Sequence, residues 1–281
     1  MKKIAWITDS ASGLSQAFIK EHNIHVVPLQ LIVNHETYRE GIDITNDEFY
    51  NILKEHGEGA KTSQPALGEF VDLYNKLKEE YEIGIALHAS SELTGTYQTS
   101  LMASKITGFD IEAIDSKMGA YVLGKLVQYA MSLEKKGKSV EEIVKAVEKM
   151  SKRAEMFLLP ASFTQMKNSG RVSTSQALIA NLLNINIVLG FDDGKVVVEE
   201  KIRGKKKVER YFKNLYNEAI EKYQLDEICI MHAGALEKAQ QWKDELKETY
   251  DDLQVVIQTL VPVAGVHAGF GTMAVSWIGN K

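Results

Sequence analysis

The sequence has one cysteine and no long hydrophobic run, and both shortages restrict where such a protein can work. One cysteine in 281 residues excludes an internal disulfide and suits a reducing compartment. Cys229 lies within an apolar run, so we expect a small buried side chain rather than a reactive thiol. No stretch approaches the roughly 18 apolar residues of a membrane helix, and the apolar run near residue 1 is too short for a signal peptide. We therefore expect a cytoplasmic globular protein without stable membrane insertion.

An excess of basic residues is also missing. The chain has 33 Lys and Arg against 38 Asp and Glu, a formal net charge of -5, so nucleic-acid binding is not expected. It has no glycine-rich phosphate loop with its lysine, and no HExxH or close Cys/His spacing, so neither a nucleotide cofactor nor a metal is predicted. At 44% hydrophobic residues, the chain can form two medium-sized cores.

In the first half, short apolar runs alternate with helical patterns, which predicts an α/β fold with a parallel sheet and flanking helices. The expected strands are residues 3–8, 25–33, 83–88 and 110–114. A helix is expected over residues 67–77, where apolar residues share one face. Capping boxes predict two more helix starts, at Ser139 and at Thr45, the second in a segment apart from the main sheet.

The second half has a different pattern. Two β-branched runs, residues 186–191 and 196–201, flank an Asp-Gly turn and predict a hairpin. Helical patterns follow at 208–223 and 236–250, with strands at 227–231, 255–260 and 272–278. We therefore predict an α+β domain over residues 156–281, after an N-terminal α/β domain over 1–155. No linker rich in Pro, Gly or Ser separates them, so the halves should pack closely.

Hydroxyl side chains gather where the third strand should end. Ser90, Ser91, Thr94 and Thr96 precede Tyr97, whereas a helix cap needs only one of them. Thr62 and Ser63 form another hydroxyl pair, interpreted as a second helix entrance. Helix N-termini carry free N–H groups and partial positive charge, so the two loops predict a site for a carboxylate or small phosphate.

These motifs, taken in order, resemble the signature series of the DegV family, bacterial fatty-acid-binding proteins that serve a fatty acid kinase. The matching segments are Thr8-Asp9-Ser10, Thr62-Ser63-Gln64-Pro65, Ser90-Ser91-x-x-Thr94-Gly95-Thr96-Tyr97-Gln98, Asp115-Ser116, Ser169-Gly170-Arg171-Val172-Ser173 and His267-x-Gly269-x-Gly271. The chain departs from the usual pattern in having Thr94 for serine and Phe270 for proline.

The resemblance implies a two-domain protein that encloses a long-chain fatty acid between its domains, with the tail in an apolar tunnel. It also implies that the protein has no catalytic activity of its own and presents the carboxylate to a partner kinase for ATP-dependent acyl-phosphate formation in phospholipid synthesis. By resemblance, Arg203 is associated with the kinase, and Arg171 is expected at the domain junction. The residues expected around the carboxylate are Thr62, Ser63, Ser91, Thr94, Gly95 and His267.

Other interpretations remain open at this point. A serine hydrolase acting on acyl esters could use His267 or His88 as base, but the sequence lacks the Gly-x-Ser-x-Gly elbow, and Thr94 would be a crowded nucleophile. A metal site could use the histidines that follow strands, including His232. The basic run that starts at Lys201 and ends at Arg210 is either a solvated surface or a docking surface for a partner.

Overall fold

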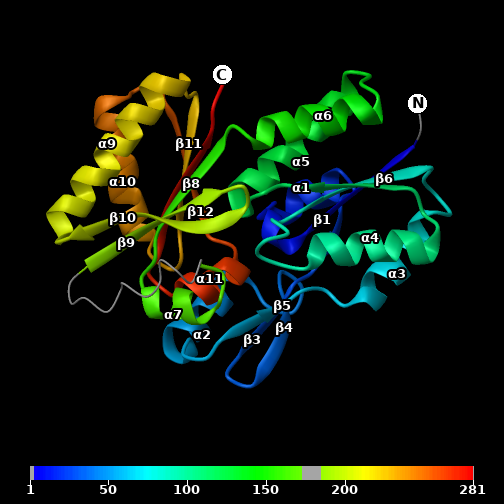
Figure 1. Cartoon of the computed structure of the whole chain (residues 1–281), viewed down its shortest axis with the longest axis horizontal. Helices are drawn as coiled ribbons and strands as arrows, with labels where there is room; N and C mark the ends of the chain where they lie inside the picture. Colours follow the sequence, from blue (N-terminus) through cyan, green and yellow to red (C-terminus); the bar gives the residue numbers. More distant parts are fainter. Residues whose placement is uncertain (1–2, 173–184, 281) are drawn as a thin grey trace.

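The chain folds around three β-sheets. The structure is a computed structural model that describes residues 3–172 and 185–280. It contains a four-stranded sheet, a six-stranded sheet and a three-stranded sheet. The two larger sheets lie side by side with helices around them, and the smallest sheet projects below (Figure 1).

The four-stranded sheet is parallel and has the strand order β2-β1-β6-β7. Its strands are β1 (Ile4–Asp9), β2 (His25–Val27), β6 (Ile83–His88) and β7 (Ile111–Asp115). Helices α3 (Leu67–Leu77) and α4 (Thr96–Thr107) cover one face, and α5 (Ala120–Lys135) and α6 (Val140–Ser151) cover the other. Because both faces are covered, every residue of β6 is buried. The predicted parallel sheet with flanking helices is confirmed.

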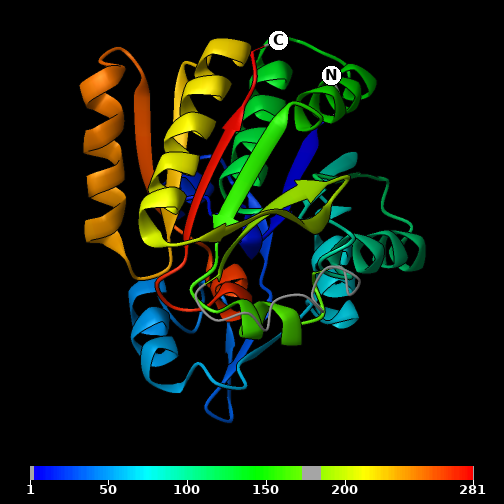
Figure 2. The same cartoon turned by 60° about the vertical axis from the view of Figure 1, so that its left-hand side comes forward.

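The six-stranded sheet is mixed and has the order β10-β9-β8-β13-β11-β12. Its strands are β8 (Ala154–Leu159), β9 (Ile185–Asp192), β10 (Lys195–Arg203), β11 (Glu227–His232), β12 (Gln254–Thr259) and β13 (Met273–Ile278). All neighbours are antiparallel except β11 and β12. Helices α9 (Lys205–Tyr223) and α10 (Leu236–Thr249) pack beside the strands (Figure 2). The predicted hairpin is β9–β10.

One predicted strand, residues 25–33, is wrong as a single element. Pro28 has no N–H to donate to a ladder, and Pro28 and Leu29 belong to no strand, so the segment divides into β2 and β3 (Gln30–Val33). β3 pairs with β4 (Glu36–Arg39) and β5 (Lys61–Ser63) in the three-stranded sheet. Thr62 and Ser63 therefore lie on a strand, not at a helix entrance, and α3 begins only after Ala66.

The capping boxes are present as predicted, because they depend on contacts only three residues apart. Thr45 and Glu48 start α2 (Asn46–His56), which packs on β3 apart from the larger sheets. Ser139 and Glu142 start α6 in the same way. Each box satisfies two N–H groups that have no partner inside the helix.

The two halves share one apolar core. Leu87 of the four-stranded sheet, Met156 of the six-stranded sheet and Leu260 after β12 belong to the same buried cluster. Helix α5 lies between the sheets and contacts both β6 and β13. The division at residues 155 and 156 remains a prediction; the strands of the six-stranded sheet begin at Ala154. Within the described residues, no helix combines the length and apolar character needed to cross a bilayer.

Candidate ligand-binding site

An apolar cavity of about 100 Å³ lies where the two halves meet. Its described lining has four polar side chains, Thr62, Thr94, Arg171 and His267, and the rest is apolar or glycine. The other lining residues are Ala11, Leu29, Ala89, Leu93, Gly119, Ala120, Met156, Leu158, Met166, Phe191, Val196, Leu260, Val261, Val263, Ala264 and Ala268. An apolar cavity with few polar groups is typical of a site for a small amphipathic ligand.

His267 and Thr62 both line the cavity, and their side chains lie within hydrogen-bond distance of each other. His267 belongs to α11 (Pro262–Ala268), and its Nε2 lies 2.8 Å from Oγ1 of Thr62 on β5. Burial lowers the pKa of His267 from 6.5 to about 4, with a smaller contribution from the positive charge of Arg171. The imidazole is therefore neutral near pH 7 and has one hydrogen-bond donor and one acceptor.

Arg171, expected at the domain junction, lines the cavity. It follows α7 (Phe163–Asn168), and its neighbour Val172 forms a bridge to Val196 of the β9–β10 hairpin. Burial lowers the pKa of Arg171, and one of its guanidinium nitrogens donates to the Ser169 carbonyl. No carboxylate of the described residues lies within ion-pair distance of it. A half-buried cation without a counter-charge favours an anionic ligand. Ser173, the last residue of its motif, lies outside the described residues.

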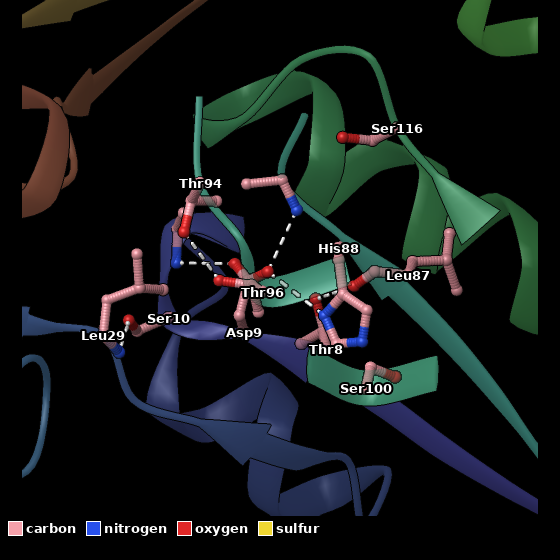
Figure 3. Close-up of polar contacts among 12 residues, drawn as sticks. Thr8, Asp9, Ser10, Leu29, Leu87, His88, Thr94, Thr96, Ser100 and Ser116 are labelled. Atoms are coloured by element: carbon pink, nitrogen blue, oxygen red, sulfur yellow. Dashed lines mark hydrogen bonds and ion pairs between the residues drawn. The ribbon is translucent and has the colours of Figure 1, made fainter. Parts of the chain in front are cut away.

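Thr94 brings the start of α4 to the cavity. Its hydroxyl lies 2.9 Å from the hydroxyl of Thr96 (Figure 3). Gly95 is the N-cap of α4 and has no side chain to cap the helix, so among the described residues the first N–H groups of α4 have no side-chain partner. A Cβ at Gly95 would lie 1.8 Å from Oε1 of Gln64, so a larger residue here would displace the Gln64 side chain, which donates to the Thr99 hydroxyl of α4.

The remaining hydroxyls near the cavity bond to the protein itself. Ser90 donates to the Gly194 carbonyl in the turn of the β9–β10 hairpin, and Ser91 donates to Asp115 at 2.6 Å. Ser63 is exposed and donates to the Gln64 carbonyl. Ser63, Ser91 and Gly95 are not among the described lining residues. We call residues 90–97, with their five hydroxyl side chains, the hydroxyl loop. Of these residues, only Thr94 lines the cavity.

Arg203 lies away from the cavity end of its hairpin. It is exposed and pairs with Ile185 at the far end of β10, seven residues after the lining residue Val196. At about 3.3 Å per residue, that places it about 23 Å along the strand. The structure therefore does not bring Arg203 together with Thr62, Thr94, Arg171 and His267.

Two buried acidic groups near the cavity were not recognised as such from the sequence. Asp9 and His88 form a fully buried pair, with Oδ2 and Nδ1 3.2 Å apart (Figure 3). Asp9 also accepts from the backbone N–H groups of Ala11 and Ala89, so it joins the ends of β1 and β6. The second group is Glu40, which is 3% exposed. Among residues 3–172 and 185–280, no cluster of three or more His, Cys, Asp or Glu could hold a metal ion.

The fold and the cavity define a class: an α/β protein with a parallel sheet, a C-terminal domain with a mixed sheet, and a largely apolar cavity whose polar lining residues include one cation. The family model described as "Uncharacterised protein, DegV family" matches residues 3–280. The chain therefore belongs to the DegV family, as the motif series predicts.

Individual relatives span the same length. The chain is 33% identical over 276 residues to Protein DegV of Bacillus subtilis (strain 168), covering 98% of each chain. Among solved structures it is similar to that of DegV, described as a fatty acid binding protein from B. subtilis, with a TM-score of 0.89, 31% identity and full coverage of both chains. It is also similar to SAG1342, described as a fatty acid binding DegV family protein from Streptococcus agalactiae, with a TM-score of 0.90, 29% identity and full coverage of both.

Proposed function

We propose that the chain binds one long-chain fatty acid in the cavity between its two halves. Its carboxylate lies among Thr62, Thr94, Arg171 and His267, and its tail lies against the apolar lining. The observation that carries the proposal is the half-buried guanidinium of Arg171, which has no carboxylate partner among the described residues and lines a largely apolar cavity. The fatty acid binding described for the relatives from B. subtilis and S. agalactiae supports it. Gly95, Ser63 and Ser91 then act indirectly, by shaping β5 and the hydroxyl loop.

The energetics agree with this division of roles. Burial of a methylene stabilises by about 0.8 kcal/mol, so a tail of about 16 carbons gains on the order of 12 kcal/mol before association costs. Removing a carboxylate from water opposes this unless hydrogen bonds and a counter-charge replace the water. Arg171 provides the charge, and Thr62, Thr94 and the N-terminus of α4 provide donors. The tail supplies affinity and the polar group supplies orientation.

The geometry favours binding over hydrolysis. The Thr62–His267 pair has a secondary hydroxyl, and no carboxylate of the described residues bonds to His267 to orient it as a base. Asp9 does orient His88, but Nε2 of His88 is buried and has no partner among the described residues. Neither histidine therefore has the nucleophile–base–carboxylate arrangement of a serine hydrolase.

Replacing Thr62 or Thr94 by alanine tests the carboxylate position. Each change should weaken binding of palmitate by roughly 1–3 kcal/mol, measured by calorimetry on delipidated protein, because a charged acceptor loses a donor. Thr94→Ser should remain within about twofold, since the hydroxyl is kept.

Ser63→Ala is the matched control, because Ser63 neighbours Thr62 on β5 and faces the opposite side of the strand. It should change the affinity less than about twofold. If Thr94→Ser instead created strong hydrolysis of an acyl ester, position 94 would be a nucleophile site and the hydrolase interpretation would stand.

We also propose that the bound carboxylate is presented to a partner kinase for ATP-dependent acyl-phosphate formation, and that the basic run docks this partner. Its six cationic side chains are all exposed: Lys201, Arg203, Lys205, Lys206, Lys207 and Arg210. Helix α9 begins within this run with no acidic residue in its first turn. Cations at a helix N-terminus oppose the helix dipole, so this placement costs stability that a docking role would explain.

Arg203→Ala tests whether fatty-acid binding and presentation of the carboxylate to the kinase depend on different residues. Palmitate affinity should stay within about twofold, because Arg203 lies far from the lining residues. The rate of acyl-phosphate formation with the partner kinase should fall about tenfold, and that reaction should weaken as salt rises. Arg39→Ala, which removes an exposed arginine paired with Asp43 in the other half, is the control. If the phosphorylation rate is unchanged, the basic run is only a solvated surface and does not dock the kinase. If palmitate binding is lost, Arg203 belongs to the binding site.

A further inference from the structure

Glu40 is a buried carboxylate outside the cavity lining, and both of its oxygens are engaged. Oε1 accepts from the backbone N–H of Val263 at 2.7 Å, and Oε2 accepts from the Ser10 hydroxyl at 2.5 Å. The Ser10 hydroxyl in turn accepts from the N–H of Leu29 at 2.9 Å (Figure 3). The backbone N–H of Glu40 donates to the Leu29 carbonyl. Glu40 therefore joins the end of β1, the segment before β3 and the start of α11.

The bond to Val263 holds the helix that carries His267. Val263 is the second residue of α11, Pro262 before it has no N–H, and no side chain caps the helix from its N-cap Val261. Among the described residues, Glu40 therefore provides the side-chain acceptor for the first N–H group of this seven-residue helix. Because the helix is short, a shift at Val263 would also move His267, which bonds to Thr62.

Burial of the Glu40 carboxylate costs free energy, and this cost indicates that Glu40 has a positional role. Burial raises the pKa of Glu40 to about 7, the bonds from Ser10 and Val263 oppose that rise, and the nearby negative charge of Asp9 adds to it. Tyr50 of α2 also faces this carboxyl, and its pKa is raised by burial and by Glu40. An apolar residue of similar size would avoid the cost if the site needed only to be filled. The fixed reach of two carboxylate oxygens is what an apolar residue would not provide.

We propose that Glu40 is a positioning residue for the ligand head group: it fixes α11 so that His267 meets Thr62 at the carboxylate end of the cavity. The proposal rests on the fatty-acid-binding function proposed above. Glu40 is not a lining residue: its carboxylate bonds to the backbone of one lining residue, Val263, and reaches a second, Leu29, through the Ser10 hydroxyl. It therefore acts through the backbone that carries the lining residues rather than on the ligand.

Substitutions that change reach and charge separately test this role. Glu40→Ala removes the acceptor, Glu40→Asp keeps the charge but shortens the reach by one methylene, and Glu40→Gln keeps an oxygen for the Val263 N–H. Two quantities are measured on delipidated protein: palmitate affinity by calorimetry, and the titration of His267 by NMR of ring-labelled histidine. The titration needs no ligand, so it still reports on α11 if palmitate fails to bind and the proposed function fails.

Glu40→Ala and Glu40→Asp should weaken palmitate binding tenfold or more and raise the pKa of His267 towards 6.5, as α11 loosens and water reaches the ring. Glu40→Gln should restore affinity to within about threefold of the wild type and keep the low pKa of His267. Tyr74→Phe, which removes a buried bond to Ser100 on the other face of the sheet, should change neither quantity.

Two results would overturn the proposal. One is an unchanged His267 titration in both Glu40→Ala and Glu40→Asp, which would make Glu40 a purely structural residue. The other is a Glu40→Gln protein as impaired as Glu40→Ala in both measurements, which would show that reach to Val263 is not what matters. If Glu40→Ala does not fold, Glu40→Asp carries the test.

Discussion

Glutamine in place of Arg171 should weaken palmitate binding about a hundredfold, or about 2.7 kcal/mol. Arg171 is the one cation among the described residues of the cavity lining, and no carboxylate of those residues pairs with it. A bound carboxylate would therefore lose its counter-charge and be left short of charge-assisted donors. Calorimetry on delipidated protein gives the affinity directly.

Arg171→Lys is the matched variant for this experiment. It keeps the positive charge but loses the planar fork that can bind both oxygens of a carboxylate, so an intermediate loss of about tenfold is expected. An Arg171→Gln protein that binds palmitate within twofold of the wild type would remove Arg171 from the carboxylate site.

The contribution of His267 to the stability of the ligand-free protein should be lost in acid. Its pKa in the folded chain is about 4, below the ordinary value of 6.5, so the unfolded chain binds the proton first. The contribution of neutral His267 to stability is fully present above pH 6.5 and is lost as the pH falls towards 4. The loss amounts to about 3 kcal/mol of unfolding free energy. Denaturant unfolding of wild type and His267→Gln at several pH values measures it.

The comparison must be made between these two proteins rather than on the wild type alone, because Glu40 acts in the opposite direction. The pKa of Glu40 in the folded chain is about 7, above the ordinary value of 4.5. Its contribution is fully present below pH 4.5 and is lost as the pH rises through 7. The two contributions largely cancel in the wild type. If the unfolding free energies of wild type and His267→Gln change equally between pH 6.5 and 4, His267 does not titrate as described.

The sequence predicts best those features that depend on near neighbours. The capping boxes at Thr45 and Ser139 and the helix at residues 67–77 arise from contacts one turn apart. The division of residues 25–33 was missed because the expected pattern gave too little weight to Pro28. The mixed sheet of the second half was predicted only in outline, since strand order depends on contacts between distant segments.

The candidate site was predictable only in part, for the same reason. The motif series places Thr62, Thr94 and His267 in one site, and the structure brings all three to one cavity. The motif series gives no sign that Glu40 bonds to Val263, which is 223 residues further along the chain. Ser63 and Ser91 carry hydroxyls, as the lining residues Thr62 and Thr94 do, and only the strand alternation and the bond to Asp115 separate them from the cavity.

The central claim is that the cavity holds a fatty acid, and extraction of the purified protein tests it most directly. Recombinant protein is extracted with organic solvent, the released lipid is identified by mass spectrometry, and its amount is compared with the protein. We expect about one long-chain fatty acid per chain, because an apolar cavity is costly to fill with water. Protein that releases no fatty acid, and that fails to bind palmitate after delipidation, would contradict the account.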